Sequence, residues 1–289
     1  MSTIILVTGA TGTVGSATVK ALSALGADVR AGVRSLIKGD NLKRLPGVEL
    51  VEINFERPES LAVAFTGVNT AFLITPFTAD QVEMAQKLTD AAQAAGVRHV
   101  VRLSASGAEV EPGIQLGQWH RQAEDYLKSS GLNYTLLRPG SFMQNFVHQY
   151  APSIKAENAF YLPMGNGRVS YIDVRDIGDV AAQILLHPDE HTQMAYTLTG
   201  PQALSGYEIA EVFSSATGRP IEYLDVPEEA ARAAMQQQNL PDWMTESLLE
   251  LNAISRAGYA SGVTSDVQQI IGRPPYTFEE FAVTYRDCF

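Results

Sequence analysis

The first half of the chain alternates short apolar runs with helical patterns, and this alternation restricts the fold more than any other feature. Strands are expected at residues 3–8, 28–33, 48–53, 70–74, 99–104 and 134–138, and helices at 14–25, 60–65, 79–95 and 119–129. The strands are nearly continuous apolar runs, as strands buried on both faces of a parallel sheet are. We therefore predict an α/β fold with a Rossmann-type doubly wound parallel sheet.

The second half of the chain is less regular. Residues 168–187 indicate one more strand and a helix, with Asp176 as the expected N-cap, and the units after Pro188 are shorter. Two capping boxes, Ser205 with Glu208 and Thr277 with Glu280, predict helix starts. We predict a Rossmann domain over residues 1–187 and a smaller, mostly helical C-terminal lobe over 188–289.

Charge and composition exclude several classes of protein. A net charge of -11 argues against binding to nucleic acid or to anionic membranes, which both require clustered Lys and Arg. The single cysteine, Cys288, allows no intrachain disulfide and no thiolate metal cluster, and we expect no metal site. The first strand begins near residue 3, which leaves no room for a secretion signal, and no apolar run is long enough to span a bilayer. We expect a cytoplasmic protein.

The stretch "ILVTGATGTVGSATVKAL" joins the first strand to the first helix through three glycines in a G-x-x-G-x-x-G spacing. Glycines at a strand-to-helix turn let a pyrophosphate approach the unpaired N–H groups of the helix N-terminus. A dinucleotide site is therefore predicted here, in the domain of residues 1–187. Its expected contacts in this stretch are Thr8, Gly9, Thr11, Gly12, Thr13, Val14 and Gly15.

The end of the second strand indicates which dinucleotide is bound. An NAD site usually places an acidic residue there for the ribose hydroxyls. This chain instead has Arg34, with Lys38 close behind, and a guanidinium can hold a phosphate in bidentate fashion. We predict a preference for NADP(H), with NAD(H) as the weaker cofactor; the alternative is that both cations are merely solvated.

Several motifs together resemble the NmrA-like branch of the atypical short-chain dehydrogenase/reductases. They are the glycine stretch, the strand that ends at Arg34, "RLSASGAE", the His120/Glu124 pair, "YTLLRPGSFMQN" and "YIDVRDIGDVAAQIL". The resemblance covers essentially the whole chain and implies a Rossmann domain with a C-terminal substrate lobe. Members of that family include bacterial NADPH:quinone oxidoreductases, triphenylmethane-dye reductases and azoreductases, and also cofactor-sensing regulators.

The chain lacks the Tyr-x-x-x-Lys pair with which short-chain dehydrogenases reduce carbonyls. Counting back from Glu124, the Lys position holds His120 and the Tyr position holds Leu116. Hydride transfer to a quinone leaves a phenolate, whose conjugate acid has a pKa near the ~10 of tyrosine, far below that of an alcohol. A cationic dye is simply neutralised. The missing pair therefore argues against alcohol and ketone chemistry and leaves quinone-like, azo and triarylmethane-dye-like acceptors.

His120 and Glu124 lie four residues apart, so they share one helix face. Glu124 could orient the imidazole and raise its pKa, and His120 could then donate a proton or hydrogen bond to the acceptor. We name His120 as the candidate catalytic residue and Glu124 as its orienting partner. The alternative is a polar pair that only holds the helix in place.

Ligands of doubly wound sheets bind beyond the carboxyl ends of the strands. The loops there predict further cofactor contacts at Thr75, Pro76, Ser104, Ala105, Ser106 and Pro139. An apolar acceptor pocket is expected from Phe77, Phe142, Met143 and Phe146, with Trp243 and Met244 closing it from the C-terminal lobe. Core packing is the alternative role for each of these apolar side chains.

Two functions follow from these observations. The first is an NADPH-dependent reductase of a small conjugated acceptor, acting as a monomer or homodimer without nucleic acid or membrane. The second is a non-catalytic sensor of the NADP(H) ratio that acts through a protein partner. The apolar residues around 142–146 and 235–244 favour the enzyme.

Overall fold

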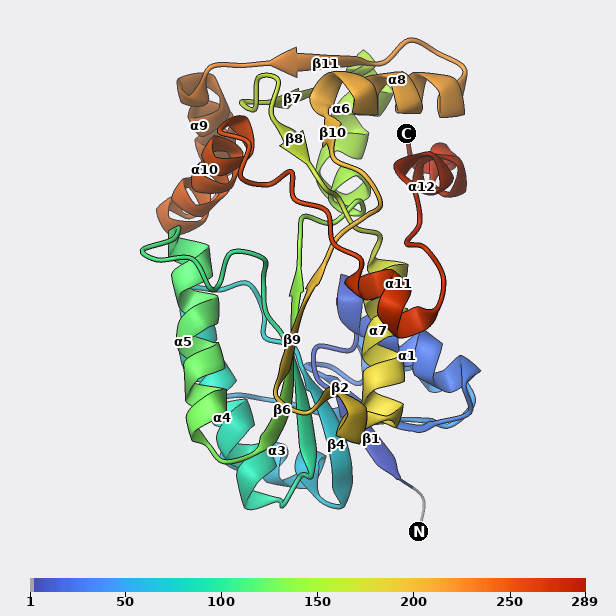
Figure 1. Cartoon of the computed structure of the whole chain (residues 1–289), viewed down its shortest axis with the longest axis vertical. Helices are drawn as coiled ribbons and strands as arrows, with labels where there is room; N and C mark the ends of the chain where they lie inside the picture. Colours follow the sequence, from blue (N-terminus) through green and yellow to red (C-terminus); the bar gives the residue numbers. More distant parts are fainter. Residues whose placement is uncertain (1–2) are drawn as a thin grey trace.

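A computed structural model of the chain describes residues 3–289 and has at its centre a seven-stranded sheet in the order β3-β2-β1-β4-β5-β6-β9 (Figure 1). Every pair of neighbouring strands in it is parallel. The strands are β1 (Ile4–Val7), β2 (Asp28–Val33), β3 (Val48–Glu52), β4 (Val68–Leu73), β5 (His99–Leu103), β6 (Asn133–Pro139) and β9 (Met194–Leu198). The predicted Rossmann-type doubly wound sheet is confirmed.

Helices cover both faces of this sheet. One face carries α3 (Pro58–Phe65), α4 (Gln81–Ala94) and α5 (Gln115–Ser129), and the other carries α1 (Thr13–Ala24), α7 (Val174–Leu186) and α11 (Asp266–Ile271) (Figure 1). The short η1 (Ile37–Gly39) and α2 (Asp40–Lys43) connect β2 to β3. Each face has its own apolar core, with Val101 in one and Val100 in the other. Neighbouring strand residues point to opposite faces, so the continuous apolar runs supply both cores.

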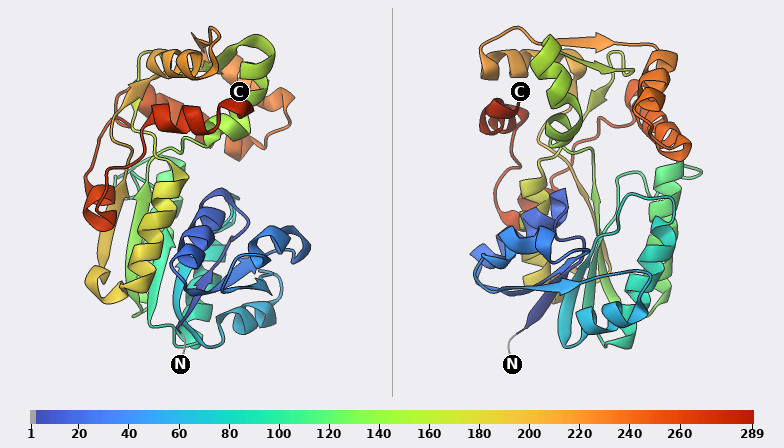
Figure 2. Two further views of the ribbon diagram at one scale, coloured as in Figure 1. Left: turned by 90° about the vertical axis from the view of Figure 1, so that its right-hand side faces the viewer. Right: turned by 180° about the vertical axis from the view of Figure 1, so that it is seen from behind.

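The second lobe lies beyond the carboxyl ends of the strands (Figure 2). It contains α6 (Ala151–Glu157), α8 (Gly206–Thr217), α9 (Glu228–Gln237), α10 (Asp242–Arg256) and α12 (Phe278–Thr284), the strand pairs β7 (Ala159–Leu162) with β11 (Glu222–Asp225) and β8 (Arg168–Val169) with β10 (Leu204–Ser205), and the short η2 (Phe146–Tyr150) and η4 (Arg286–Cys288). Aromatic rings fill its core: the Phe146 ring packs against those of Phe160, Phe213 and Phe278.

The two lobes do not divide the chain at residue 187, which corrects the expected boundary. Strand β9, after η3 (Pro188–His191), pairs with β6 in the large sheet, with Met194 opposite Thr135. Conversely, Ile154 and Phe160 belong to the core of the C-terminal lobe. The chain therefore crosses between the lobes several times. Strand β9 returns to the large sheet and pairs with β6 as its edge strand.

Local signals in the sequence fix most helix ends. Both expected capping boxes are present, and Gly26, Gly96 and Gly131 have positive φ just after helices, where glycine commonly closes the last turn. The N-cap of α7 is Asp173, whose carboxylate accepts the Arg175 N–H, so the expectation of Asp176 was wrong by one turn. Within residues 3–289, no helix has the length and apolar character that crossing a membrane requires.

Candidate functional site

The glycine turn between β1 and α1 leaves the start of the helix open. Gly12 is the N-cap of α1; it offers no side chain to the first-turn N–H groups, and the first turn holds no acidic residue. Gly9 has φ +59, and a Cβ on Gly15 would lie 2.3 Å from the Gly9 carbonyl oxygen. Only glycine permits this turn, and the exposed N–H groups with the helix dipole suit an anion such as a pyrophosphate.

Two of the expected contacts in this stretch face inward. The Thr8 hydroxyl donates to the Ile74 carbonyl (2.9 Å) and accepts the Ile74 N–H (2.7 Å), and the residue is only 1% exposed. Thr8 therefore ties the ends of β1 and β4 together instead of offering its hydroxyl to a ligand. Val14 packs its side chain into the core, so only its backbone can reach a ligand. Gly9, Thr11 and Gly12 are exposed, and Thr13 is half-buried.

Arg34 and Lys38 lie at the end of β2, beside the glycine turn. The Ala10 N–H donates to the Gly32 carbonyl and joins the two segments. Both cations are exposed, and neither makes an ion pair or a side-chain hydrogen bond with any residue in the described part of the chain. Two unpaired positive charges next to an open helix N-terminus are an arrangement that suits a phosphorylated ligand.

The loops after β4, β5 and β6 meet at the same edge of the sheet. The Ser106 N–H donates to the Pro139 carbonyl, and the Ser104 N–H to the Leu137 carbonyl. Thr75, Pro76 and Ala105 are half-buried, Ser106 is exposed, and Pro139 is buried. The expected cofactor loops are therefore adjacent to one another, although the Ser104 hydroxyl is already used by Glu124 (2.6 Å).

Glu124 does not orient His120, which corrects the expected pairing. Its carboxylate accepts a bidentate pair from Arg138 (2.9 and 2.6 Å) as well as the Ser104 hydroxyl. Burial alone would raise the pKa of Glu124, but these hydrogen bonds outweigh it and hold the pKa below its usual value. Arg138 thus takes the carboxylate because a guanidinium offers two parallel donors where an imidazole offers one.

His120 is neutral at physiological pH. Burial, and then the nearby positive charge of Arg102, lower its pKa to about 3 against the opposing effect of Glu124. Its Nδ1 is buried and has no hydrogen-bond partner among residues 3–289. The expectation of a raised pKa was therefore wrong, because burial and a neighbouring cation both disfavour the imidazolium.

Sequence reasoning missed Arg102, which lies on β5 near His120 and Glu124. The side chain is 1% exposed, and all three guanidinium nitrogens lack a hydrogen-bond partner in residues 3–289. Burial lowers the pKa of Arg102 to about 10, with Glu124 acting in the opposite direction, so the group stays charged at neutral pH. The signal that could have revealed it is a lone arginine inside the apolar run "HVVRLS".

Aromatic side chains from three elements meet above the carboxyl end of β4. The Phe77 ring centroid lies 5.2 Å from that of Trp243, and Trp119 lies 5.8 Å from Trp243 on another side. Phe77 follows β4, Trp119 is on α5 and Trp243 is on α10, which stands above α5 (Figure 1). We call these three residues the aromatic cluster. Phe77 and Trp243 were expected to approach each other, whereas Trp119 was missed.

The other expected pocket residues have different places. Met143 and Phe146 are each 1% exposed and belong to the core of the C-terminal lobe, so they are not available to an acceptor in this structure. Phe142 is half-buried and forms a bridge with Ile172. Met244 is half-buried beside Trp243. Met143 and Phe146 are core residues because the second lobe needs apolar packing under its two small sheets.

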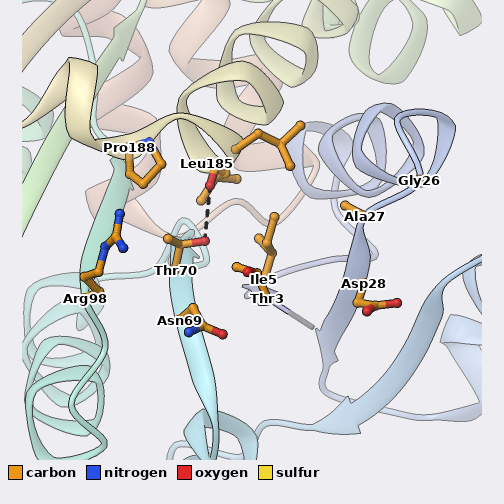
Figure 3. Close-up of a pocket in the computed structure, with 11 residues that line it drawn as sticks. Thr3, Ile5, Gly26, Ala27, Asp28, Asn69, Thr70, Arg98, Leu185 and Pro188 are labelled. Atoms are coloured by element: carbon orange, nitrogen blue, oxygen red, sulfur yellow. Dashed lines mark hydrogen bonds between the residues drawn. The ribbon is translucent and has the colours of Figure 1, made fainter. Parts of the chain in front are cut away.

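A surface cavity of about 410 Å³ lies at the opposite end of the sheet (Figure 3). It is lined by the first residues of the strands, including Ile5, Asp28 and Asn69, and the Thr70 hydroxyl in it donates to the Leu185 carbonyl. Ligands of doubly wound sheets bind at the carboxyl ends, so this cavity is not where the fold places chemistry. No group of three or more His, Cys, Asp or Glu residues suited to a metal ion occurs within residues 3–289.

Comparison with protein families and known proteins agrees with this geometry. Residues 1–282 match the profile described as "NmrA-like family". The chain is 39% identical over 286 residues to an NAD(P)H azoreductase of Xenophilus azovorans, covering 99% of each chain.

Two solved structures are similar along nearly their whole length. One is the NADPH-dependent quinone oxidoreductase QOR2 of Escherichia coli complexed with NADPH, with TM-score 0.87, 25% identity and coverage of 97% of this chain and 99% of that one. The other is the Citrobacter triphenylmethane reductase complexed with NADP(H), with TM-score 0.85, 26% identity and coverage of 99% and 100%.

Proposed function

Because this chain belongs to the NmrA-like family, we propose that it is an NAD(P)H-dependent oxidoreductase that transfers hydride to a quinone-like, azo or triarylmethane-dye-like acceptor. The relatives named for such reactions cover nearly the whole chain, so both lobes needed for the activity are present. Within this class we propose NADPH as the preferred donor.

The cofactor half of the proposal rests on the glycine turn and the two free cations. The N–H groups of the turn and of the first turn of α1 would hold the pyrophosphate, and Gly15 keeps the turn close to the helix. Arg34, with Lys38 behind it, would bind the 2′-phosphate that distinguishes NADPH from NADH. The loops at Thr75, Ser104 and Ser106 would then flank the nicotinamide end.

The acceptor half rests on the aromatic cluster and on the presence of Leu116 and His120 in place of the Tyr-x-x-x-Lys pair. Bound NADPH supplies a hydride, and Phe77, Trp119 and Trp243 offer ring faces and edges that suit a flat conjugated molecule. His120 is neutral and Ser104 is committed to Glu124, so neither is poised as a strong proton donor. Such a site suits acceptors whose reduced form is a weak base, and water can protonate them afterwards.

The observation that carries the proposal is the pairing of an open helix N-terminus with the unpaired Arg34 and Lys38 at the neighbouring strand end. The test follows NADPH oxidation with a panel of a naphthoquinone, an azo dye and a triarylmethane dye. We expect turnover with at least one of them, and a lower rate when NADH replaces NADPH.

Calorimetry of NADPH binding to the same protein separates two ways of failing. Tight binding without turnover of any acceptor would contradict the reductase and favour the NADP(H) sensor with a protein partner. Failure to bind either NADPH or NADH would overturn both functions.

A further inference from the structure

Arg102 is a buried cation whose guanidinium has no hydrogen-bond partner among residues 3–289. It is the fourth residue of β5, where it lies opposite Leu73 of β4 and Leu136 of β6. Leu73, Val100 and Leu136 share the core beneath α4 and α5, so the alternation along β5 directs Arg102 to that same face. Its three guanidinium nitrogens are buried and make no hydrogen bond within residues 3–289.

The nearby carboxylate of Glu124 makes no hydrogen bond to Arg102 within residues 3–289. Both oxygens of Glu124 are occupied, one by Ser104 and Arg138 and the other by Arg138 and Lys128. His120 is uncharged and presents a buried, unpaired Nδ1. The charge of Glu124, which raises the pKa of Arg102, is therefore already balanced by Arg138 and Lys128.

An unpaired buried charge costs several kcal/mol of folding free energy, and apolar side chains of similar size are usually better tolerated. Arg102 also lies close to the carboxyl end of β5. Ser104 is two residues further along and on the same face, about 7 Å away at the rise of a strand. The guanidinium thus lies beneath the loop expected beside the nicotinamide and beneath the helix that carries His120 and Trp119.

We propose that Arg102 determines the charge preference of the acceptor site, favouring acceptors that gain negative charge when they receive hydride over acceptors that are already cationic. This inference rests on the proposed reductase function. Arg102 acts through its field and touches neither cofactor nor acceptor, so it is a specificity-determining residue and not a catalytic one.

The charge balance of the reactions explains the preference. A quinone that takes the hydride of NADPH becomes a hydroquinone monoanion, and an azo bond becomes a hydrazide anion; each then takes a proton from water, and NADP⁺ is released. A cationic triarylmethane dye that takes the same hydride becomes a neutral leuco dye. A fixed positive charge stabilises the anions as they form and disfavours the binding of the cation.

The test compares Arg102→Met with the matched control Arg98→Met. Both variants lose one positive charge, but Arg98 lies at the amino end of β5, where it is 61% exposed and paired with Asp189. For a separation of about 10 Å between the guanidinium and the acceptor and an effective dielectric constant of about 20, removal of one charge changes a rate or affinity on the order of tenfold. We expect Arg102→Met to lower the ratio of kcat/KM for 1,4-naphthoquinone to kcat/KM for crystal violet by that factor, with Arg98→Met leaving the ratio unchanged.

Stability measurements separate this role from a structural one. We expect Arg102→Met to keep or raise Tm, and Arg102→Lys to keep the acceptor ratio of the wild type. A large fall in Tm together with an equal loss of both activities would overturn the inference, as would an unchanged acceptor ratio in Arg102→Met.

Binding measurements keep the inference testable if the wild type reduces no acceptor. Trp119 and Trp243 are the only two tryptophans, so quenching of their fluorescence reports acceptor binding at the aromatic cluster. Absence of turnover would reject the proposed function. The quantity compared is the affinity for a sulfonated azo dye divided by the affinity for crystal violet. If Arg102→Met leaves this ratio unchanged, the role of Arg102 is rejected; a fall in the ratio would support it.

Discussion

Arg34 is the exposed side chain that we propose discriminates between two cofactors that differ by a single phosphate. Because Arg34 has no partner among residues 3–289, its donors are free for a ligand. A charge-assisted bidentate contact contributes about 1.5–3 kcal/mol. We expect Arg34→Ala to lower the ratio of NADPH affinity to NADH affinity by about 10- to 100-fold, as measured by calorimetry with each cofactor.

Arg44→Ala is the matched control for this variant, because Arg44 is also exposed and its loss changes the net charge equally. It should leave the ratio of the two affinities unchanged. Equal ratios in Arg34→Ala and the wild type would contradict the assignment of Arg34 to the 2′-phosphate.

His120 gives the protein a weakness toward acid. Its pKa of about 3 in the fold lies below the usual value of 6.5, so between these values the unfolded chain binds a proton that the folded chain does not. Stability must then fall as pH decreases through that range. His99, whose pKa burial lowers to about 4, acts in the same direction.

We expect His120→Gln to lose less stability than the wild type as the pH falls. The free energy of unfolding, measured with urea, should decrease by about 2 kcal/mol less between pH 6.5 and pH 5. His148→Gln, at an exposed position, should show the same pH dependence of the free energy of unfolding as the wild type. A His120→Gln protein whose stability falls as steeply as the wild type would show that the imidazole is protonated equally in both states.

Turnover of a quinone should fall less than about 100-fold in His120→Ala, below the usual contribution of a general acid.

At the scale of elements, α10 brings the C-terminal lobe to the carboxyl end of the sheet. It stands above α5 (Figure 2), and Trp243 in its first turn reaches Phe77 and Trp119. Thr245 and Leu249, one turn apart, are buried on one face of the helix. The contact between α10 and α5 combines these rings with a hydrogen bond from the Gln115 N–H to the Glu250 carboxylate (2.9 Å).

Removing the Trp243 ring should weaken the acceptor and spare the cofactor. Aromatic contacts contribute about 0.5–1.5 kcal/mol beyond the area they bury, so we expect Trp243→Ala to raise KM for a quinone about 3- to 10-fold. Tyr259→Ala removes another ring, 83% exposed, and should change neither value. A weaker affinity for NADPH in Trp243→Ala, with KM for the quinone unchanged, would place the ring at the cofactor instead.

At the scale of the whole molecule, ion pairs and a hydrogen bond join the C-terminal segment to α7, which covers the large sheet. Arg273 follows α11 and donates to Asp176 (2.7 Å) and Asp179 (2.6 Å) on α7, and the Tyr276 N–H donates to Asp176 (2.9 Å). Burial raises the pKa of Asp176 to about 6, against the hydrogen bonds from Tyr276 and Arg273. The segment that leads to α12 is thus fixed to α7 through a buried carboxylate.

Arg273→Met would leave Asp176 charged and buried without its main partner. We expect a loss of about 2–3 kcal/mol at pH 7.5, below the range for a fully buried pair because the Arg273 side chain is 35% exposed. The loss should be smaller at pH 5, where Asp176 is mostly protonated and costs less to bury. Urea unfolding at both pH values measures this, with Arg286→Met, 63% exposed, as the control. A loss that is equal at both values would contradict a charged Asp176 at pH 7.5.

The amino-acid sequence by itself determined the strands of the large sheet, several helix ends and the glycine turn on which the proposed cofactor site rests. Buried parallel strands are continuous apolar runs, helix ends carry capping boxes and glycines, and the glycine turn is local in the chain. Each of these signals lies within a few residues of its effect, so local chemistry suffices to predict it. Arg34 and Lys38 could be named as candidates for the same reason, because they follow directly after the second strand.

Only the tertiary structure decided which side chains face each other. Glu124 takes Arg138, on β6, in place of His120 on its own helix face; β9 returns to the large sheet; and Phe146 enters a core of rings from distant segments. The burial of Arg102 beneath α4 and α5 depends on packing of the same kind. Such contacts join residues far apart in sequence, and their energies come from burial and charge pairing that no local pattern records.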